Sequence, residues 1–167
     1  MGSYFYGKPE VCAWVREHFP PPDSTILDVG ACDGIWLHHW LPEYMCMDAV
    51  EAYEPNLRNL WGYREVFHAD IRDFKYNPYD LIIFGDILEH LSVEDAQKVL
   101  EYAKPRCRDM IIAVPFLYEQ DALYGNPYEV HLQPDLTPEL FEERYPGFAV
   151  LCDPGHNYRY YHKGDAE

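Results

Sequence analysis

Four polar residues have the types and spacing to hold a metal ion or move a proton: Asp86, Glu89, His90 and, later in the chain, His131. In a helical turn that starts at Asp86, positions 86, 89 and 90 are related as i, i+3 and i+4 and share one face. Two carboxylates and an imidazole suit Mg²⁺ or another divalent metal, and His131 could supply a fourth ligand. Because imidazoles titrate near neutral pH, His90 and His131 are also the candidate general bases.

A second group of candidates lies in residues 26–34, where an apolar run leads through a glycine-containing turn into a helical pattern. Gly30 allows a tight turn, and Gly34 lets a ligand or the next helix approach closely. Asp28 precedes the first glycine by two positions, and the amides at the start of the following helix point toward the same place. The G-x-G-x-x-G spacing of nicotinamide dinucleotide folds is absent, which disfavours an oxidoreductase of that kind.

Seven apolar runs of strand length must position these residues. They are residues 25–29, 45–52, 65–68, 81–84, 110–114, 148–152 and 158–162. Helical spacing separates several of them, and Ser92 and Thr137 are the expected starts of two helices. Strands that are apolar on both faces and alternate with helices indicate a doubly wound α/β fold with a mostly parallel, seven-stranded, Rossmann-like sheet.

The last two runs are joined by the turn-rich residues 153–157, which predict an antiparallel C-terminal hairpin at the edge of the sheet. In doubly wound sheets, ligands bind at the carboxyl ends of the strands. The candidate residues follow such strand ends, so we expect them to meet at one ligand site.

Residues 28–34 resemble the D-x-G-x-G-x-G signature of class I S-adenosylmethionine-dependent methyltransferases, with Cys32 in place of the middle glycine. The resemblance implies that the loop faces the methionine end of S-adenosylmethionine, whose amino and carboxylate groups need a carboxylate and backbone donors. The cofactor-binding residues implied here are Asp28, Gly30, Ala31, Cys32 and Gly34.

Three further marks of this family follow in order. Glu51 matches the family's acid that accepts hydrogen bonds from both ribose hydroxyls of S-adenosylmethionine. Glu54 is a rival if the strand is longer, and both acids could instead be solvated loop residues. Asp70, followed by Ile71, matches the acid that accepts from the adenine amino group. Residues 86–91 are similar to the D-x-L-E-H-L segment of small-molecule methyltransferases, including those of ubiquinone synthesis.

The set Asp86, Glu89, His90 and His131 also looks like the metal site of small-RNA 2′-O-methyltransferases and of some quinone O-methyltransferases. Asp86 is one methylene shorter than the glutamate usual in the RNA enzymes. Many metal-free members carry Glu-His at this place. The alternative is therefore that Glu89 and His90 brace the loop without a metal, while Asp86 lines the cofactor pocket.

The length of 167 residues fits a single domain, residues 1–167, with an N-terminal helix region at 1–22. The acceptor pocket is expected from residues 4–8 and from a substrate loop at 115–136. A net charge of −16 disfavours nucleic acid as the substrate. The chain carries no apolar run long enough to span a bilayer and no signal-peptide pattern, so a cytoplasmic protein without membrane contact is expected.

Taken together, the motifs predict an S-adenosylmethionine-dependent methyltransferase that acts on an oxygen or nitrogen of a small-molecule acceptor. The alternative is a catalytically silent binding module with the same fold, which Cys32 in the glycine loop and the short substrate cap both allow. A short cap is also compatible with a large acceptor or with a second chain that completes the pocket in an oligomer.

Overall fold

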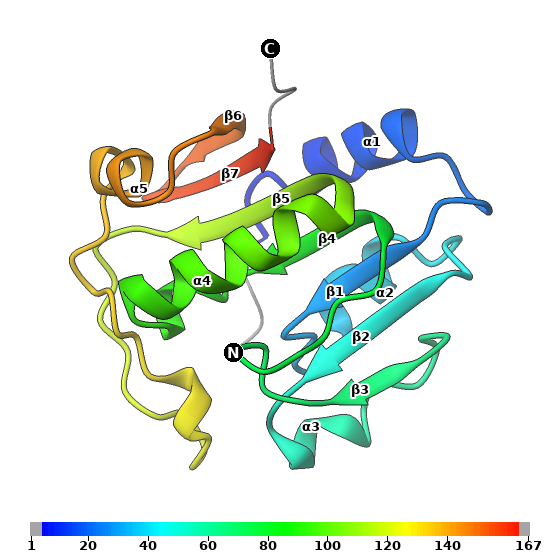
Figure 1. Ribbon diagram of the computed structural model, residues 1–167, viewed down its shortest axis with the longest axis horizontal. Helices are drawn as coiled ribbons and strands as arrows, with labels where there is room; N and C mark the ends of the chain where they lie inside the picture. The colour runs from blue at the N-terminus through cyan, green and yellow to red at the C-terminus, as the bar shows by residue number, and fades with distance from the viewer. Residues whose placement is uncertain (1–4, 164–167) are drawn as a thin grey trace.

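Seven strands form one sheet in the order β3-β2-β1-β4-β5-β7-β6 (Figure 1). The structure is a computed structural model and describes residues 5–163, without the side chains of residues 35, 36 and 38. The strands are β1 (Ile26–Val29), β2 (Met47–Glu51), β3 (Val66–His68), β4 (Tyr79–Gly85), β5 (Cys107–Pro115), β6 (Phe148–Gly155) and β7 (Tyr158–Lys163). Strands β1 to β5 pair in parallel, whereas β7 is antiparallel to both β5 and β6.

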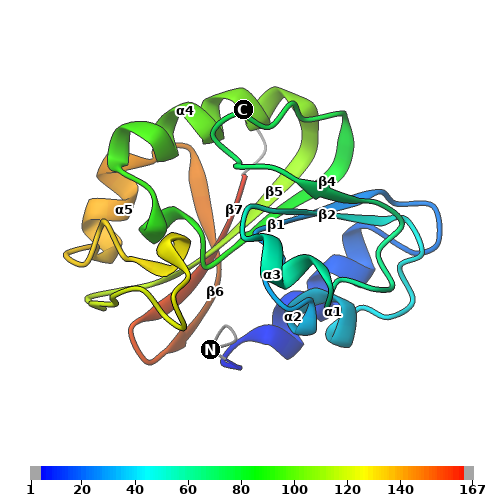
Figure 2. The same ribbon diagram turned by 90° about the horizontal axis from the view of Figure 1, so that it is seen from below.

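Helices cover both faces of this sheet, with α1, α2 and α3 on one side and α4 and α5 on the other (Figure 2). The helices are α1 (Lys8–His18), α2 (Ile35–Trp40), α3 (Glu54–Leu57), α4 (Val93–Ala103) and α5 (Pro138–Arg144), and the 3₁₀ turns are η1 (Leu88–His90), η2 (Lys104–Arg106) and η3 (Pro127–Glu129). Within the described residues, no helix has the length and apolar character needed to cross a membrane.

Alternate residues of each central strand enter two separate cores. In β4, Ile82 and Phe84 pack in the core under α4 and α5, whereas Leu81 and Ile83 pack in the core under α1 and α2. All four side chains are fully buried. Burying a side chain of this size is worth about 1.5–3 kcal/mol, so these central strands are the rigid support for whatever lies at their ends.

Side-chain caps set where α4 and α5 begin. The Ser92 hydroxyl accepts a hydrogen bond from the Asp95 amide at 3.1 Å, and the Thr137 hydroxyl accepts one from the Leu140 amide at 3.2 Å. Such caps contribute about 1 kcal/mol each. The Ser92 cap therefore ends the segment that contains Glu89 and His90 at a defined point.

The predicted fold class is confirmed, including the C-terminal hairpin, with one difference in detail. The sequence predicts one antiparallel pair at the edge, but the sheet has two, because β7 lies between β5 and β6. The chain leaves β5, passes α5 to the outer position of β6, and returns as β7 beside β5. Residues 1–4 and 164–167 of the expected single domain lie outside the described residues.

Candidate functional site

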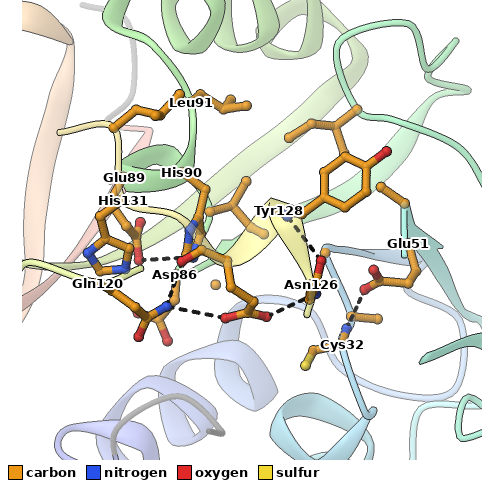
Figure 3. A pocket seen from close by; sticks show the side chains of 18 of the residues that line it. Cys32, Glu51, Asp86, Glu89, His90, Leu91, Gln120, Asn126, Tyr128 and His131 are labelled. Carbon is orange, nitrogen blue, oxygen red and sulfur yellow. Dashed lines mark hydrogen bonds and ion pairs between the residues drawn. The ribbon is translucent and has the colours of Figure 1, made fainter. Parts of the chain in front are cut away.

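A cavity of about 540 Å³ opens at the carboxyl ends of β1, β2 and β4. Every predicted site residue except Gly34 lines it. Figure 3 shows the cluster of Glu89, His90 and His131 on one side of the view and Glu51 with Cys32 on the other. The strand ends thus bring together residues from distant parts of the sequence, as expected for a doubly wound sheet.

The loop after β1 has a left-handed backbone at every second position. The φ angles are 69° at Gly30, 54° at Cys32 and 74° at Gly34. Left-handed backbone favours glycine, since a Cβ there approaches the neighbouring carbonyl oxygen. Cys32 therefore adopts a backbone conformation that favours glycine, at the position where the motif has its middle glycine.

Gly30 also lacks room for a side chain, and this leads to a prediction. A Cβ at Gly30 would lie 2.0 Å from Cδ1 and 2.9 Å from Cγ1 of Ile87. We expect Gly30→Ala to lower the free energy of unfolding by about 3 kcal/mol, from backbone strain together with overpacking. Gly125 is a matched control, because its φ is 76° and a Cβ added there would have nothing within 4 Å. Gly125→Ala should cost only about 1 kcal/mol in urea unfolding, and equal losses would contradict the steric argument.

Asp28 in β1 is 4% exposed, and its carboxylate accepts a hydrogen bond from the Tyr63 hydroxyl at 2.5 Å. Burial raises the pKa of Asp28 to about 7, and the negative charge of Glu51 acts in the same direction. The Tyr63 hydrogen bond and the positive charge of Lys8 oppose the shift. Asp28 is thus a carboxyl of the cavity lining whose charge changes near neutral pH.

Glu51 is the last residue of β2 and is 6% exposed. Its Oε2 accepts from the Cys32 amide and its Oε1 from the Tyr53 amide, both at 2.7 Å. Burial raises the pKa of Glu51, and these two amides oppose the rise. Glu54 instead begins α3 and is exposed, away from the cavity lining. The strand end favours Glu51 over Glu54 as the acid that faces a ligand.

Asp70 and Ile71 line the cavity beyond the end of β3. Both carboxylate oxygens of Asp70 accept from the guanidinium of Arg72, at 2.9 and 2.5 Å. This pairing lowers the pKa of Asp70. An adenine amino group that approached Asp70 would therefore share a carboxylate already held by Arg72.

Asp86 lines the cavity but does not lie on a helical face with Glu89 and His90. Its φ is 55°, and the 3₁₀ turn begins only at Leu88, so the predicted i, i+3, i+4 relation is wrong for this residue. The Oδ1 atom of Asp86 accepts from the Tyr158 hydroxyl at 2.6 Å. Tyr158 pairs with the end of β5, which holds Asp86 to the middle of the sheet.

Three of the predicted metal ligands come together. One ligand atom from each of Glu89, His90 and His131 lies within 4.8 Å of the other two. The two imidazole rings pack edge to face, with centroids 4.7 Å apart. Asp86, the fourth predicted ligand, is outside this group of ligand atoms in the part of the chain described.

Backbone hydrogen bonds determine which nitrogen each imidazole presents. Nδ1 of His90 lies 3.3 Å from the Val130 carbonyl oxygen, and Nδ1 of His131 lies 2.8 Å from that of Tyr118. A carbonyl can only accept, so each Nδ1 carries the proton and each Nε2 keeps its lone pair. This is the tautomer in which Nε2 can bind a metal or take a proton.

The segment that carries His131 is tied to η1. The amides of Leu132 and Gln133 both donate to the backbone carbonyl of Glu89, at 2.7 and 3.2 Å. The buried Gln133 side-chain amide also donates to the carbonyls of Leu88 and Leu91. These bonds place His131 beside His90 even though about forty residues separate them in the chain.

Glu89 is the most unusual group of the site. It is 1% exposed, and both of its carboxylate oxygens are buried without a hydrogen-bond partner among the described residues. Burial raises the pKa of Glu89 well above its ordinary value, and the negative charge of Asp86 adds to the rise. Burial also lowers the pKa of His90 to about 4, so this imidazole is neutral at physiological pH.

The sequence does not identify Tyr63 or Tyr158 as site residues, and it assigns Lys8 only to the expected acceptor pocket. The two tyrosines reach Asp28 and Asp86 across 35 and 72 residues, and no local pattern marks them. Lys8 is 5% exposed and lines the cavity. A basic residue where α1 begins is the only sequence signal for it.

The sheet order, the glycine loop after β1 and the cavity at the strand ends define the class I S-adenosylmethionine-dependent methyltransferase fold. The resemblance found in the sequence is thereby confirmed at the level of the fold, which solved structures share. No protein-family model and no curated protein matches the chain.

Three solved structures illustrate the likeness. An S-adenosylmethionine-dependent methyltransferase from Clostridium acetobutylicum has a TM-score of 0.70 at 12% identity, over 95% of this chain and 91% of its own. The magnesium protoporphyrin IX methyltransferase of Synechocystis, with bound S-adenosylmethionine, gives 0.65 at 13%, over 93% and 76%. The amino pentose methyltransferase CalS10 of Micromonospora echinaspora, also with bound S-adenosylmethionine, gives 0.67 at 13%, over 93% and 88%.

Proposed function

We propose that this protein is an S-adenosylmethionine-dependent methyltransferase that acts on an oxygen or nitrogen atom of a small-molecule acceptor. The observation that carries the proposal is the buried carboxylate of Glu51 at the end of β2, which lines the cavity and accepts a hydrogen bond from the Cys32 amide of the glycine loop. Two of the three solved structures described above contain S-adenosylmethionine, and those two proteins methylate a porphyrin and an amino sugar.

The residues present fit this cofactor. Its ribose diol needs an acceptor pair, which the Glu51 carboxylate supplies, and its ammonium needs an anion, which Asp28 supplies when ionised. Gly30 lets the loop pass directly against the Ile87 side chain, and both residues line the cavity. When bound, S-adenosylmethionine supplies an electrophilic methyl group on a sulfonium. The chain itself aligns the acceptor, excludes water and takes up the acceptor's proton.

We further propose that residues 115–136 form the acceptor side of the cavity within a single domain of residues 1–167. Tyr118, Gln120, Tyr128 and Glu129 of this loop all line the cavity. The aromatic side chains offer a wall to a planar or apolar acceptor.

The five cysteines are free thiols, which supports the cytoplasm as the protein's location.

We propose, in addition, that Glu89, His90 and His131 hold a divalent metal ion. The fit rests on the Glu89 carboxylate, which is buried beside two imidazoles whose Nε2 lone pairs are available. An ion would compensate a buried charge that is otherwise costly. A bound ion would lower the pKa of an acceptor hydroxyl. Without an ion, we assign proton uptake to Nε2 of His131, because the low pKa of His90 makes it a weak base.

The cofactor proposal is tested by calorimetric titration of S-adenosylmethionine. We expect the wild-type protein to bind it, and Glu51→Gln to raise the dissociation constant about 100-fold, since two charge-assisted hydrogen bonds are lost. Glu54→Gln is the matched control, because Glu54 is exposed outside the cavity, and its affinity should equal that of the wild type.

The outcomes of this titration separate the alternatives. Loss of binding in Glu54→Gln but not in Glu51→Gln would indicate that Glu54, and not Glu51, binds the ribose. Absence of binding by the wild type would reject the methyltransferase proposal. Binding that Glu51→Gln weakens, together with no turnover on any acceptor tried, would support the silent binding module instead.

A further inference from the structure

Lys8 is a buried cation among carboxylates. It is the first residue of α1, is 5% exposed and lines the cavity. The carboxylates of Asp86, Asp28 and Asp33 all act on its ammonium group. These acids belong to the ends of β4 and β1 and to the loop after β1, so Lys8 lies where the two central strands of the sheet end.

The charges that line the cavity are strongly unbalanced. The acids of the lining are Asp28, Asp33, Glu51, Asp70, Asp86, Glu89 and Glu129. Against these, Lys8 and Arg72 are the only lysine or arginine residues among the described residues of the lining. Arg72 makes its ion pair with Asp70, beyond the end of β3. An anionic group bound near the loop after β1 therefore has Lys8 as its cationic partner among the lining residues.

A rigid contact holds Lys8 at this place. Gly7, which precedes it, has a φ of 76°, and a Cβ there would lie 2.8 Å from the Tyr160 ring and 3.1 Å from the Cys152 sulfur. The Tyr160 hydroxyl also donates to the Tyr6 carbonyl at 2.9 Å. The start of α1 thus docks closely on the C-terminal hairpin, which fixes the backbone from which the Lys8 side chain extends.

We propose that Lys8 binds the carboxylate of the methionine end of S-adenosylmethionine, and so makes the site selective for ligands that carry an amino-acid tail. The inference rests on the proposed function and adds a residue to it. The zwitterionic tail brings one cation and one anion into an acidic cavity. Asp28 suits the ammonium, and Lys8, whose charge acts on Asp28, is the group of opposite sign in the same cavity lining.

The experiment compares two ligands that differ in this tail. S-Adenosylhomocysteine carries the carboxylate, whereas 5′-deoxy-5′-methylthioadenosine has the same nucleoside and sulfur without it. In calorimetric titrations, we expect Lys8→Met to weaken binding of S-adenosylhomocysteine about 10- to 100-fold, the range for hydrogen bonds to charged groups. Affinity for methylthioadenosine should change less than about threefold. Lys8→Arg, which keeps the charge, should recover part of the loss.

Two further variants keep the test decisive. Lys8→Gln takes the place of Lys8→Met if the latter does not fold, and Lys98→Met, an exposed lysine of α4, should bind both ligands as the wild type does. Equal losses for the two ligands in Lys8→Met would overturn the inference and leave Lys8 a structural counter-ion of Asp86 and Asp28. Failure of the wild type to bind either ligand would instead reject the proposed function.

Discussion

Adding Mn²⁺ to the metal-free protein is expected to raise its melting temperature by about 5–10 °C when the free ion is near 100 times its dissociation constant. Binding at that ratio stabilises the folded state by about 2.7 kcal/mol, and 1 kcal/mol corresponds to about 2–4 °C for a chain of this size. Glu89→Gln should remove the rise, because the carboxylate beside His90 and His131 is lost.

Glu89→Gln also distinguishes two explanations for Glu89: a metal ligand, or a buried acid without a function. Without metal, Glu89→Gln should melt at a higher temperature than the wild type above neutral pH, since it lacks a carboxyl that is costly to ionise where it is buried. Glu94→Gln, exposed on α4, is the control. It should leave the metal-dependent rise unchanged and lower the metal-free melting temperature only slightly, because it loses an exposed ion pair with Lys98. Scanning calorimetry with and without Mn²⁺ or Mg²⁺ measures both. An undiminished rise in Glu89→Gln would contradict the proposed ligands.

The second large effect concerns Asp28, whose substitution should stabilise the protein while weakening its binding of S-adenosylmethionine. The unfolded chain loses the Asp28 proton near pH 3.8, whereas the folded protein keeps it until about pH 7. Because the folded state binds more protons in this window, stability falls as pH rises through it. At about 1.4 kcal/mol per pKa unit, Asp28→Asn should be more stable than the wild type by about 4 kcal/mol at pH 8, and by less than about 1 kcal/mol at pH 4.

Urea unfolding at the two pH values measures this difference, with Asp121→Asn as an exposed control that should show none. The asparagine carbonyl can still accept from the Tyr63 hydroxyl, so the hydrogen bond is retained. The variant should nevertheless bind S-adenosylmethionine more weakly, because the anion that faces its ammonium is gone. A stability gain that is the same at pH 4 and pH 8 would rule out ionisation as its source.

The fold is predictable from the sequence because its signals are local and repeated. Apolar runs such as residues 81–84 are buried on both faces, and the caps at Ser92 and Thr137 start their helices where the sequence indicates. The end of the second strand also follows from a local argument. An unpaired charge does not fit inside a covered strand, and β2 ends at Glu51.

The parts of the site that depend on long-range geometry are not predictable in this way. A helical turn starting at Asp86 would place it on one face with Glu89 and His90, but its backbone is left-handed. Its carboxylate instead accepts from Tyr158 and acts on the charge of Lys8, two residues far apart in the chain. The pairing of Asp70 with Arg72 is local, yet the sequence alone does not say that it occupies both carboxylate oxygens. Such contacts depend on packing that no spacing rule describes.

The contact of Gly7 with Tyr160 makes the cavity sensitive to events far from it. Lys8 is in place only while the start of α1 rests on the hairpin, and the Tyr160 to Tyr6 hydrogen bond spans 154 residues. Any ligand that uses Lys8 is therefore thermodynamically linked to the docking of β7, so its binding energy also resists detachment of the hairpin. The start of α1 and the C-terminal hairpin are therefore coupled, and a ligand bound to Lys8 would stabilise the contact between them.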